Sequence, residues 1–236
     1  MSDIAPAEVS CPRCGQAQRA TLWTSLDVDA VAAQREALRE GCFEACSCAG
    51  CGLEFRPEHR LLVTLPADRI FLVMVPPAER ASFAALEVLV EQVVARELAA
   101  APPIAAERLR GVRPRLVFGQ HGLTEAVRII EAGLDPALLE CAKLMAIRAA
   151  LGGLLPYGPF ELTFVEQGAD GRLRLLVRRL ADAAVVDELM LPAAALEEVA
   201  AARAELADRF PELFERPYVA ACRYLQPGSA ASAAGG

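Results

Sequence analysis

Apolar and polar side chains alternate along the first quarter of the chain in a way that is typical of half-exposed β-strands. Residues 16–28 place Leu22 and Leu26 on the same side of such a strand. Two apolar runs, Leu61–Leu65 and Phe71–Val75, flank a Pro-Ala-Asp-Arg sequence and predict a hairpin. The amino-terminal part of the chain is therefore expected to form a small antiparallel sheet.

In the middle of the chain, the spacing of apolar residues changes from that of a strand to that of a helix. Between Ala78 and Ala100, apolar residues recur every three or four positions, which predicts an amphipathic helix. A short apolar run at Arg115–Phe118 predicts a strand. A helix over Leu123–Ala132 is expected to end at Gly133, because glycine is common just after a helix. Asp135-Pro136 is expected to begin the next helix, since Asp caps helices and Pro suits their first position.

Alternation returns in the last third of the chain. Phe160–Val165 and Arg172–Arg178 alternate between apolar and polar positions on either side of Gly168–Gly171, which predicts a hairpin. A third strand is expected at Val185–Leu191. Pro192 is expected to begin one final helix that ends before Pro211.

Six of the eight cysteines lie in the first quarter, and four of them occur in two copies of one motif. The sequences CPRCG, at residues 11–15, and CAGCG, at residues 48–52, are both C-x-x-C-G. A C-x-x-C turn directs two thiolates at one metal ion, and the following glycine lets the backbone approach the sulfurs. A redox-active dithiol and inert thiols are the alternatives. We expect a closed, structural Zn2+ site made by Cys11, Cys14, Cys48 and Cys51.

The remaining cysteines are less informative. Cys46 is an alternative to Cys48 as a metal ligand, through a wider spacing of four intervening residues, but Cys48 reproduces the spacing of the first motif. We interpret Cys42 and Cys46 as small, half-buried strand residues. Cys141 and Cys222 lie in apolar sequence and are expected to be core thiols.

The order of the motifs is informative. The CPRCG turn is followed by a strand-like segment ending at Val28, then by the CAGCG turn and the two apolar runs. In this order the chain resembles the CpXC family, which is named for a C-P-x-C motif. The resemblance is clearest over residues 9–76 and continues through Val117–Gly119 and Glu131–Asp135, although Ala49 stands where proline is usual. It implies a metal-binding module and a bacterial source, and it implies no particular activity.

These patterns together predict an α+β fold. Residues 1–76 are expected to form a CpXC-like, zinc-ribbon-like antiparallel sheet that needs its metal, because about 70 residues bury only a modest core. Residues 77–227 are expected to form an α+β body with helices and a carboxy-terminal β-hairpin or meander. Residues 228–236 are rich in Gly, Ser and Ala and predict a flexible tail.

Composition restricts the compartment and the partners. A net charge of −7 repels nucleic acids and anionic bilayers. No apolar run reaches the ~18–20 residues of a membrane helix, and the amino-terminal sequence lacks the apolar region of a secretory signal. We expect a cytoplasmic protein that contacts no membrane and has an unidentified protein, rather than nucleic acid, as its partner.

Two histidines and two arginine clusters are the remaining candidates for chemistry. His59 is expected on the surface, in a charged turn. His121 lies at the start of a helix, where an anion site or a general base is the alternative to a surface role. Both arginine clusters could bind phosphates, but we expect solvated faces on which each arginine pairs with a nearby Asp or Glu. The first cluster is Arg108, Arg110, Arg113 and Arg115, and the second is Arg172, Arg174 and Arg178.

These observations favour a non-enzymatic zinc-binding protein whose four-cysteine ribbon serves as a protein-interaction platform or adaptor. The sequence contains no recognisable phosphate-binding loop or hydrolase motif. A nucleic-acid-associated regulator that uses the arginine-rich faces is the first alternative. An enzyme with a site around His121 is the weaker one.

Overall fold

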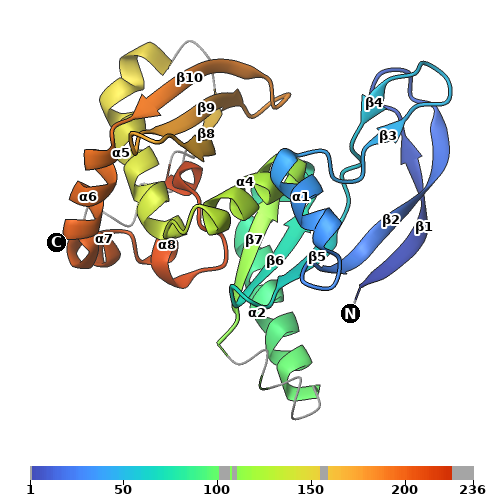
Figure 1. The fold of residues 1–236 in the computed structure, drawn as a ribbon, viewed down its shortest axis with the longest axis horizontal. Coiled ribbons are helices and arrows are strands. Elements are labelled where there is room, and N and C mark those ends of the chain that lie inside the picture. Colours follow the sequence, from blue (N-terminus) through green and yellow to red (C-terminus); the bar gives the residue numbers. More distant parts are fainter. Residues whose placement is uncertain (1, 101–106, 108–110, 155–158, 225–236) are drawn as a thin grey trace. The chain divides into compact units, whose positions relative to one another are not determined.

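The computed structural model describes residues 2–100, 107, 111–154 and 159–224 (Figure 1). Helices and strands alternate in an α+β fold, which confirms the predicted class. The chain divides into two compact units, Met1–Val127 and Arg128–Gly236. Within the described ranges, no helix combines the length and the apolar content that a membrane span requires.

A five-stranded sheet of order β1-β2-β5-β6-β7 forms the base of the first unit. Strands β1 and β2 pair antiparallel, as do β5 and β6, whereas β2 pairs parallel to β5 and β6 pairs parallel to β7. The sheet is therefore mixed rather than antiparallel, because helices in the connections allow the chain to return in the same direction. The strands are β1 (Asp3–Ser10), β2 (Ala17–Asp27), β5 (Leu61–Leu65), β6 (Ile70–Val75) and β7 (Arg113–Phe118).

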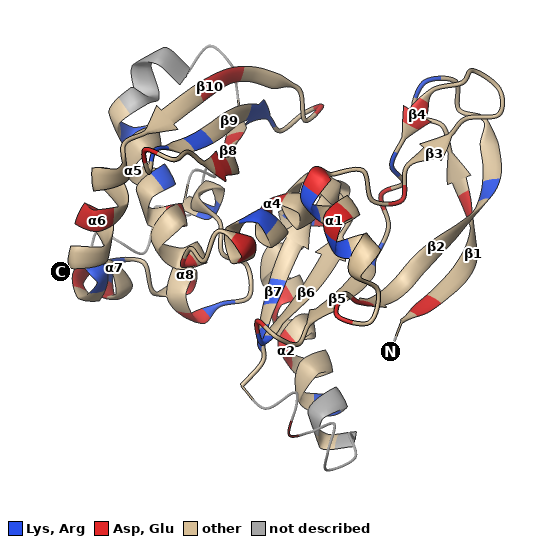
Figure 2. Ribbon diagram, viewed as in Figure 1, with Lys and Arg blue, Asp and Glu red and all other residues tan. Residues whose placement is uncertain are grey.

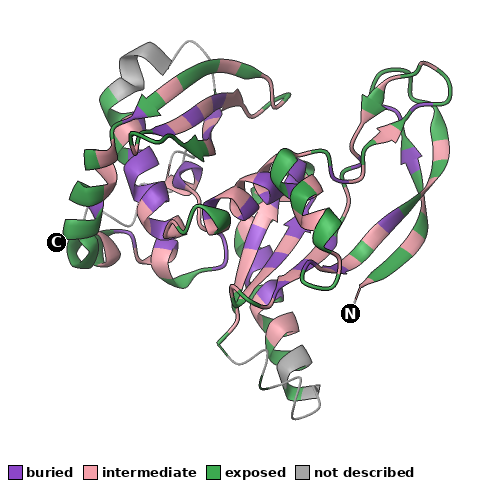
Figure 3. Ribbon diagram, in the orientation of Figure 1, coloured by how far each residue is buried: buried purple, intermediate pink, exposed green. Residues whose placement is uncertain are grey.

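The core of this unit follows the alternation that the sequence predicts. Buried positions alternate along β5, so one face of that strand is apolar and packed (Figure 3). Helices α1 (Ala32–Glu40) and α4 (Gly119–Glu131) contribute Leu38 and Leu123, which are both fully buried. Burial of each such leucine stabilises the fold by about 1.5–3 kcal/mol.

Two hairpins carry the C-x-x-C-G motifs. The first motif is the turn between β1 and β2, and the second is the turn between β3 (Cys46–Ser47) and β4 (Glu54–Phe55). Strand β2 pairs with β5 only from Ser25 to Asp27. The far end of the β1–β2 hairpin, with its motif, therefore projects beyond the rest of the sheet and lies beside β3 and β4 (Figure 1).

The helix predicted from Ala78 begins as the 3-10 helix η1 (Pro77–Ser82) and continues as α2 (Phe83–Ala100). Leu86 and Val90 are buried, as the period predicts. Glu87, a charged residue of the same helix, is also buried and only 4% exposed.

Strand β7 extends the first unit beyond residue 76, where the sequence suggested a boundary. Its parallel pairing with β6, from Arg113 opposite Ile70 to Phe118 opposite Val75, keeps it in the same sheet. The compact unit therefore runs to Val127. The CpXC-like module over residues 1–76 stays a prediction.

The second unit combines helix α5 (Pro136–Leu154) with the predicted meander. Strands β8 (Phe160–Gln167), β9 (Leu173–Arg179) and β10 (Val185–Leu191) form an antiparallel sheet of order β10-β9-β8. The core packs their inward side chains against those of α5. Its fully buried members include Leu139 and Leu144 from the helix and Phe164, Leu173 and Leu175 from the strands.

The last helix differs from its prediction. The segment after Pro192 forms α6 (Ala193–Ala201) and α7 (Arg203–Arg209) instead of one helix, because Ala202 leaves the helical conformation at φ −90° and ψ 10°. Helix α8 (Pro211–Glu215) and the 3-10 helix η3 (Ala221–Tyr224) follow. The predicted flexible tail, residues 228–236, lies outside the described residues.

Candidate metal centre

The two C-x-x-C-G motifs fold into the same turn. In the first, the amides of Gly15 and Cys11 donate hydrogen bonds of 2.9 Å to the carbonyls of Cys11 and Gln16. In the second, the equivalent amides of Gly52 and Cys48 donate bonds of the same length to the equivalent carbonyls. The repeated sequence spacing thus produces a repeated backbone structure, although only the first motif contains proline.

The glycine that ends each motif has a conformation that other residues avoid. Gly15 has φ of 71° and Gly52 has φ of 67°, both in the left-handed region. This conformation turns the chain back into the second strand of each hairpin, and glycine adopts it without the clash that a Cβ atom introduces. The glycine in the motif is therefore a requirement of the turn.

The four sulfurs of the two turns lie together. The Sγ atoms of Cys11 and Cys51 are 3.6 Å apart, as are those of Cys14 and Cys48. All four sulfurs lie within 4.8 Å of one another. Zinc–sulfur bonds of about 2.3 Å in a tetrahedron separate the sulfurs by about 3.8 Å, whereas a disulfide bond measures about 2.05 Å. The arrangement is close enough to hold a metal ion.

Neighbouring thiols in the cluster oppose one another's deprotonation, and a bound cation would reverse that effect. The backbone amide of Cys14 is the largest influence that lowers the pKa of Cys11, to about 6. The amide of Gln16 lowers the pKa of Cys14, but hydrogen bonds with the sulfurs of Cys48 and Cys11 outweigh it and raise that pKa to about 12. Adjacent sulfurs resist becoming thiolates together, and a bound divalent cation removes this resistance.

The cluster is open on one side. Cys11 and Cys48, the first cysteines of the two motifs, are 2% and 3% exposed. Cys14, the second cysteine of the first motif, is exposed, and Cys51 is half-buried. Each turn therefore contributes one sheltered and one accessible sulfur.

A glutamine on β2 joins the two turns. The side-chain amide of Gln18 donates to the carbonyl of Ser47 at 3.0 Å, and its oxygen accepts the N–H of Ala49 at 3.0 Å. One side chain thereby satisfies two backbone groups of the second turn. Sequence reasoning missed this residue; its position three residues after the first motif is the only signal that the sequence offers.

The other cysteines of this region lie outside the cluster. The Sγ atom of Cys46 lies 3.5 Å from the carbonyl of Glu44, and burial raises the pKa of the Cys46 thiol. Cys48, and not Cys46, is the member of the four-sulfur cluster. Cys42 is exposed in the turn after α1, where its amide donates to Ala37, so its expected place in a strand is wrong.

The comparison with protein families agrees with this geometry. The family model described as CpXC protein matches residues 9–143, which is more than half of the chain. The chain belongs to the CpXC family. The matched range contains both cysteine turns, the whole first sheet from β2 onward and the beginning of α5. The curated proteins and the solved structures yield no match to the chain.

A buried carboxylate joins the cysteine hairpins of this CpXC protein to its sheet. Glu44, whose side chain is 5% exposed, accepts the backbone N–H of Trp23 on β2. His59 lies on the other side, with Nε2 2.9 Å from the carbonyl of Trp23 and 3.3 Å from the Glu44 carboxylate. Burial raises the pKa of Glu44 above its ordinary value. His59, which was expected on the surface, has a side chain that is 17% exposed and contacts this carboxylate.

A carboxylate of the protein lies at the start of α4, close in sequence to His121. The carboxylate of Glu58 accepts the backbone N–H of Gln120 at 3.3 Å, and Gln120 itself is buried and lies 3.4 Å from the carbonyl of Pro57. The favourable position for a negative group at this helix end is therefore taken by the protein itself. The alternative of an anion site at His121 finds no support in this arrangement.

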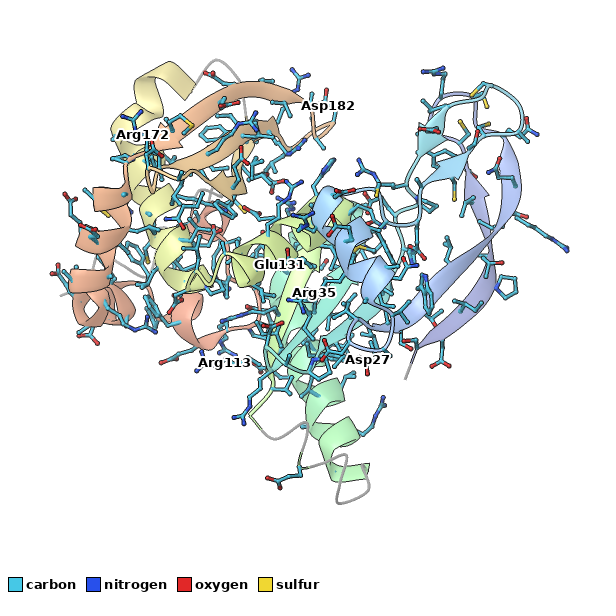
Figure 4. The ribbon with its side chains drawn as sticks, in the orientation of Figure 1. Asp27, Arg35, Arg113, Glu131, Arg172 and Asp182 are labelled. Carbon is cyan, nitrogen blue, oxygen red and sulfur yellow. The ribbon has the colours of Figure 1, made fainter. Side chains whose placement is uncertain are left out.

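The arginine face of the second unit is largely paired. Arg174 lies 3.0 Å from Glu188 and 3.5 Å from Glu166, and Arg172 lies 3.3 Å from Asp170. Acidic and basic residues are interspersed over these strands, and the labelled Arg172 and Asp182 flank β9 (Figures 2 and 4). Arg108 and Arg110 of the other cluster lie outside the described residues.

The two carboxy-terminal cysteines are core residues, as predicted. Cys141 is 1% exposed, and burial raises its pKa to about 11. Cys222 is also buried, with its sulfur 3.1 Å from the hydroxyl of Tyr218. Neither thiol is suited to nucleophilic chemistry, which requires an accessible thiolate.

Proposed function

We propose that this CpXC protein binds zinc at the four-cysteine cluster and that the metal has a structural role. The observation that carries the proposal is the convergence of four sulfurs from two equivalent turns. Four thiolates at tetrahedral spacing favour zinc or iron among biological metals, and four protein ligands leave no open position for a substrate. Cys11, Cys14, Cys48 and Cys51 would hold the ion.

Elemental analysis of the purified chain tests this proposal. One zinc ion per chain, with iron below a tenth of that amount, is the expected result. Iron in place of zinc would overturn the identity of the metal, and absence of both would overturn the site. Cys42→Ser serves as a matched control, because Cys42 lies outside the cluster and is exposed.

The proposed role of the ribbon is to present a rigid surface to a protein partner. The residues between the cysteines of each turn, Pro12 and Arg13 in the first and Ala49 and Gly50 in the second, are exposed. A metal that fixes both turns lowers the entropy lost when a partner binds them. Cysteine ligands require reducing conditions, so the proposed compartment is the cytoplasm.

Capture of partners from the lysate of the native organism tests the platform. The tagged chain is compared with Arg13→Glu, which changes the charge of the first turn, and with Arg172→Glu, which makes the same change in the other unit. A partner that binds the wild-type chain and Arg172→Glu but not Arg13→Glu supports the role. An identical set of partners for all three chains, each with one zinc ion, contradicts it.

A binding titration separates this role from nucleic-acid regulation. The paired state of Arg172 and Arg174 and the net charge of −7 both weaken attraction to phosphates. Tight binding of DNA or RNA at ~150 mM salt would therefore favour the nucleic-acid-associated regulator over the protein-interaction platform.

A further inference from the structure

The accessible sulfurs of the metal centre each lie beside a sheltered sulfur of the opposite turn. Exposed Cys14 is 3.6 Å from buried Cys48, and half-buried Cys51 is 3.6 Å from buried Cys11. Each of these two contacts crosses from one turn to the other. This arrangement provides an entry point for an oxidant and, next to it, a second thiolate that can complete a disulfide.

We propose that the cysteine cluster is a site of reversible oxidation by peroxides, which joins the two turns through Cys14–Cys48 and releases the metal. The inference rests on the proposed zinc site and deepens it. Cys14 is the sulfur oxidised first, because it is the most exposed member of the cluster. Cys48 completes the bond, since its sulfur is the close neighbour of Cys14.

The chemistry balances with hydrogen peroxide as the oxidant. The Cys14 thiolate attacks one peroxide oxygen, the O–O bond breaks, and the products are a sulfenic acid and hydroxide. The Cys48 thiolate then attacks the Cys14 sulfur, an S–S bond forms, and the sulfenic oxygen leaves as hydroxide. Two thiolates, one peroxide and two protons thus give one disulfide and two waters. Cys14 and Cys48, once joined, could no longer hold a Zn2+ ion as thiolates, and the charge of that ion would not change.

The same contacts allow a second disulfide between Cys51 and Cys11. Oxidation across the turns has a different structural result from oxidation within each motif. A Cys14–Cys48 bond keeps the β1–β2 and β3–β4 hairpins covalently joined after the metal has left, whereas Cys11–Cys14 and Cys48–Cys51 bonds would separate them. The crossed pairing therefore preserves a folded, metal-free form that thiol reductants can return to the starting state.

Tryptic peptides distinguish the two pairings, because Arg13 lies between Cys11 and Cys14. Cleavage after Arg13, Arg19, Arg39 and Arg60 places Cys11 in peptide 1–13, Cys14 in 14–19, and Cys48 and Cys51 in 40–60. The chain carrying Cys42→Ser and Cys46→Ser is used so that peptide 40–60 holds no other thiol. Zinc-loaded protein is treated with hydrogen peroxide, alkylated at acidic pH, digested and analysed by mass spectrometry, while a colorimetric chelator records zinc release.

Metal content measured before oxidation separates the two proposals. If the protein holds no zinc, the proposed function fails and the inference fails with it, since there is no metal to release. If it holds one zinc ion, we expect peptide 14–19 linked to 40–60, zinc release in step with that link, and recovery of zinc binding after reduction. A link between peptides 1–13 and 14–19, over-oxidised cysteine without a link, or zinc retained in excess peroxide would each overturn the inference and leave the zinc site standing.

Discussion

The side chain of Gln18 on β2 holds the backbone of Ala49 in the second cysteine turn. Its oxygen accepts the Ala49 N–H at 3.0 Å, while its nitrogen donates to the neighbouring carbonyl of Ser47 at 3.0 Å. The two cysteine hairpins are therefore joined by protein hydrogen bonds as well as by the proposed metal. This contact joins the first cysteine hairpin to the second through protein atoms alone.

Gln18→Ala is expected to loosen the metal centre without removing a ligand. Two exposed hydrogen bonds are lost, and the free energy of unfolding should fall by about 1–2 kcal/mol. Zinc should pass to a competing chelator several-fold faster than from the wild-type chain. Gln16→Ala is the control, because the bond that Gln16 makes within the first turn uses its backbone carbonyl. Equal rates for both variants would contradict the role of Gln18.

Glycine in the second turn provides a test of backbone conformation. Gly52 has φ of 67° with nothing within 4 Å of an added Cβ, so Gly52→Ala suffers only backbone strain, of about 1–2 kcal/mol. Gly50 has no such φ, and an added Cβ there meets the end of the flexible Gln16 side chain. Denaturation of both variants should show a larger loss of unfolding free energy for Gly52→Ala than for Gly50→Ala. The reverse order would argue against the described conformation of the turn.

Glu44 is expected to make stability depend on pH. Burial is the largest influence on the pKa of Glu44 and raises it above the ordinary value of about 4.5. The Trp23 amide and His59 lower this pKa, but by less. Between the ordinary and the raised pKa, the folded state binds a proton that the unfolded state has lost. The free energy of unfolding of the wild-type chain, relative to Glu44→Gln, should therefore decrease as the pH rises through this range.

Urea denaturation of both chains at several pH values measures this difference. The difference in unfolding free energy between the wild-type chain and Glu44→Gln should level off once the pH exceeds the raised pKa of Glu44. A difference that grows with rising pH, or none at all, would contradict the buried position of this carboxylate. NMR titration of the Glu44 carboxyl carbon provides a direct check of the same pKa.

Asp135 is expected to stabilise the second unit at the start of α5. Its carboxylate accepts the amides of Ala137 at 2.9 Å and Leu138 at 3.4 Å, and it pairs with Arg203. Asp135→Ala should lower the free energy of unfolding by about 1 kcal/mol, the usual contribution of a helix cap. Asp135→Asn keeps an acceptor for the amides and should lose less.

The pH dependence of this cap has the opposite sign to that of Glu44. Burial would raise the pKa of Asp135, but Arg203 and the two amides outweigh it and lower the pKa below 3.8. The stabilisation by the charged group is complete above that ordinary value and is lost as the pH falls through the lowered pKa. Thermal melting between about pH 2 and pH 6 should show the advantage over Asp135→Asn shrinking only at the acidic end.

Local rules predicted most of the elements and the four-cysteine cluster. Strand alternation placed the hairpin at residues 61–75 and the meander at residues 160–191, and the motif spacing selected Cys48 over Cys46. These features depend on neighbours in the sequence. They are therefore visible without a structure.

Features that depend on distant residues were not predicted. The parallel pairing of β7 with β6 joins segments on either side of a helix, so the extent of the first unit could not be derived from local periods. The positions of Gln18, Glu44 and His59 depend on side chains that meet across hairpins. In each case, a polar residue without a local signal satisfies backbone groups far along the chain.

The number of zinc ions per chain, measured by elemental mass spectrometry for single cysteine variants, tests the central claim most directly. We expect one zinc ion in the wild-type chain and in Cys46→Ser, and a large loss in Cys14→Ser and Cys48→Ser, with chelation unfolding the cysteine hairpins. Full zinc content in Cys48→Ser together with loss in Cys46→Ser, or a wild-type chain without zinc, would contradict the account.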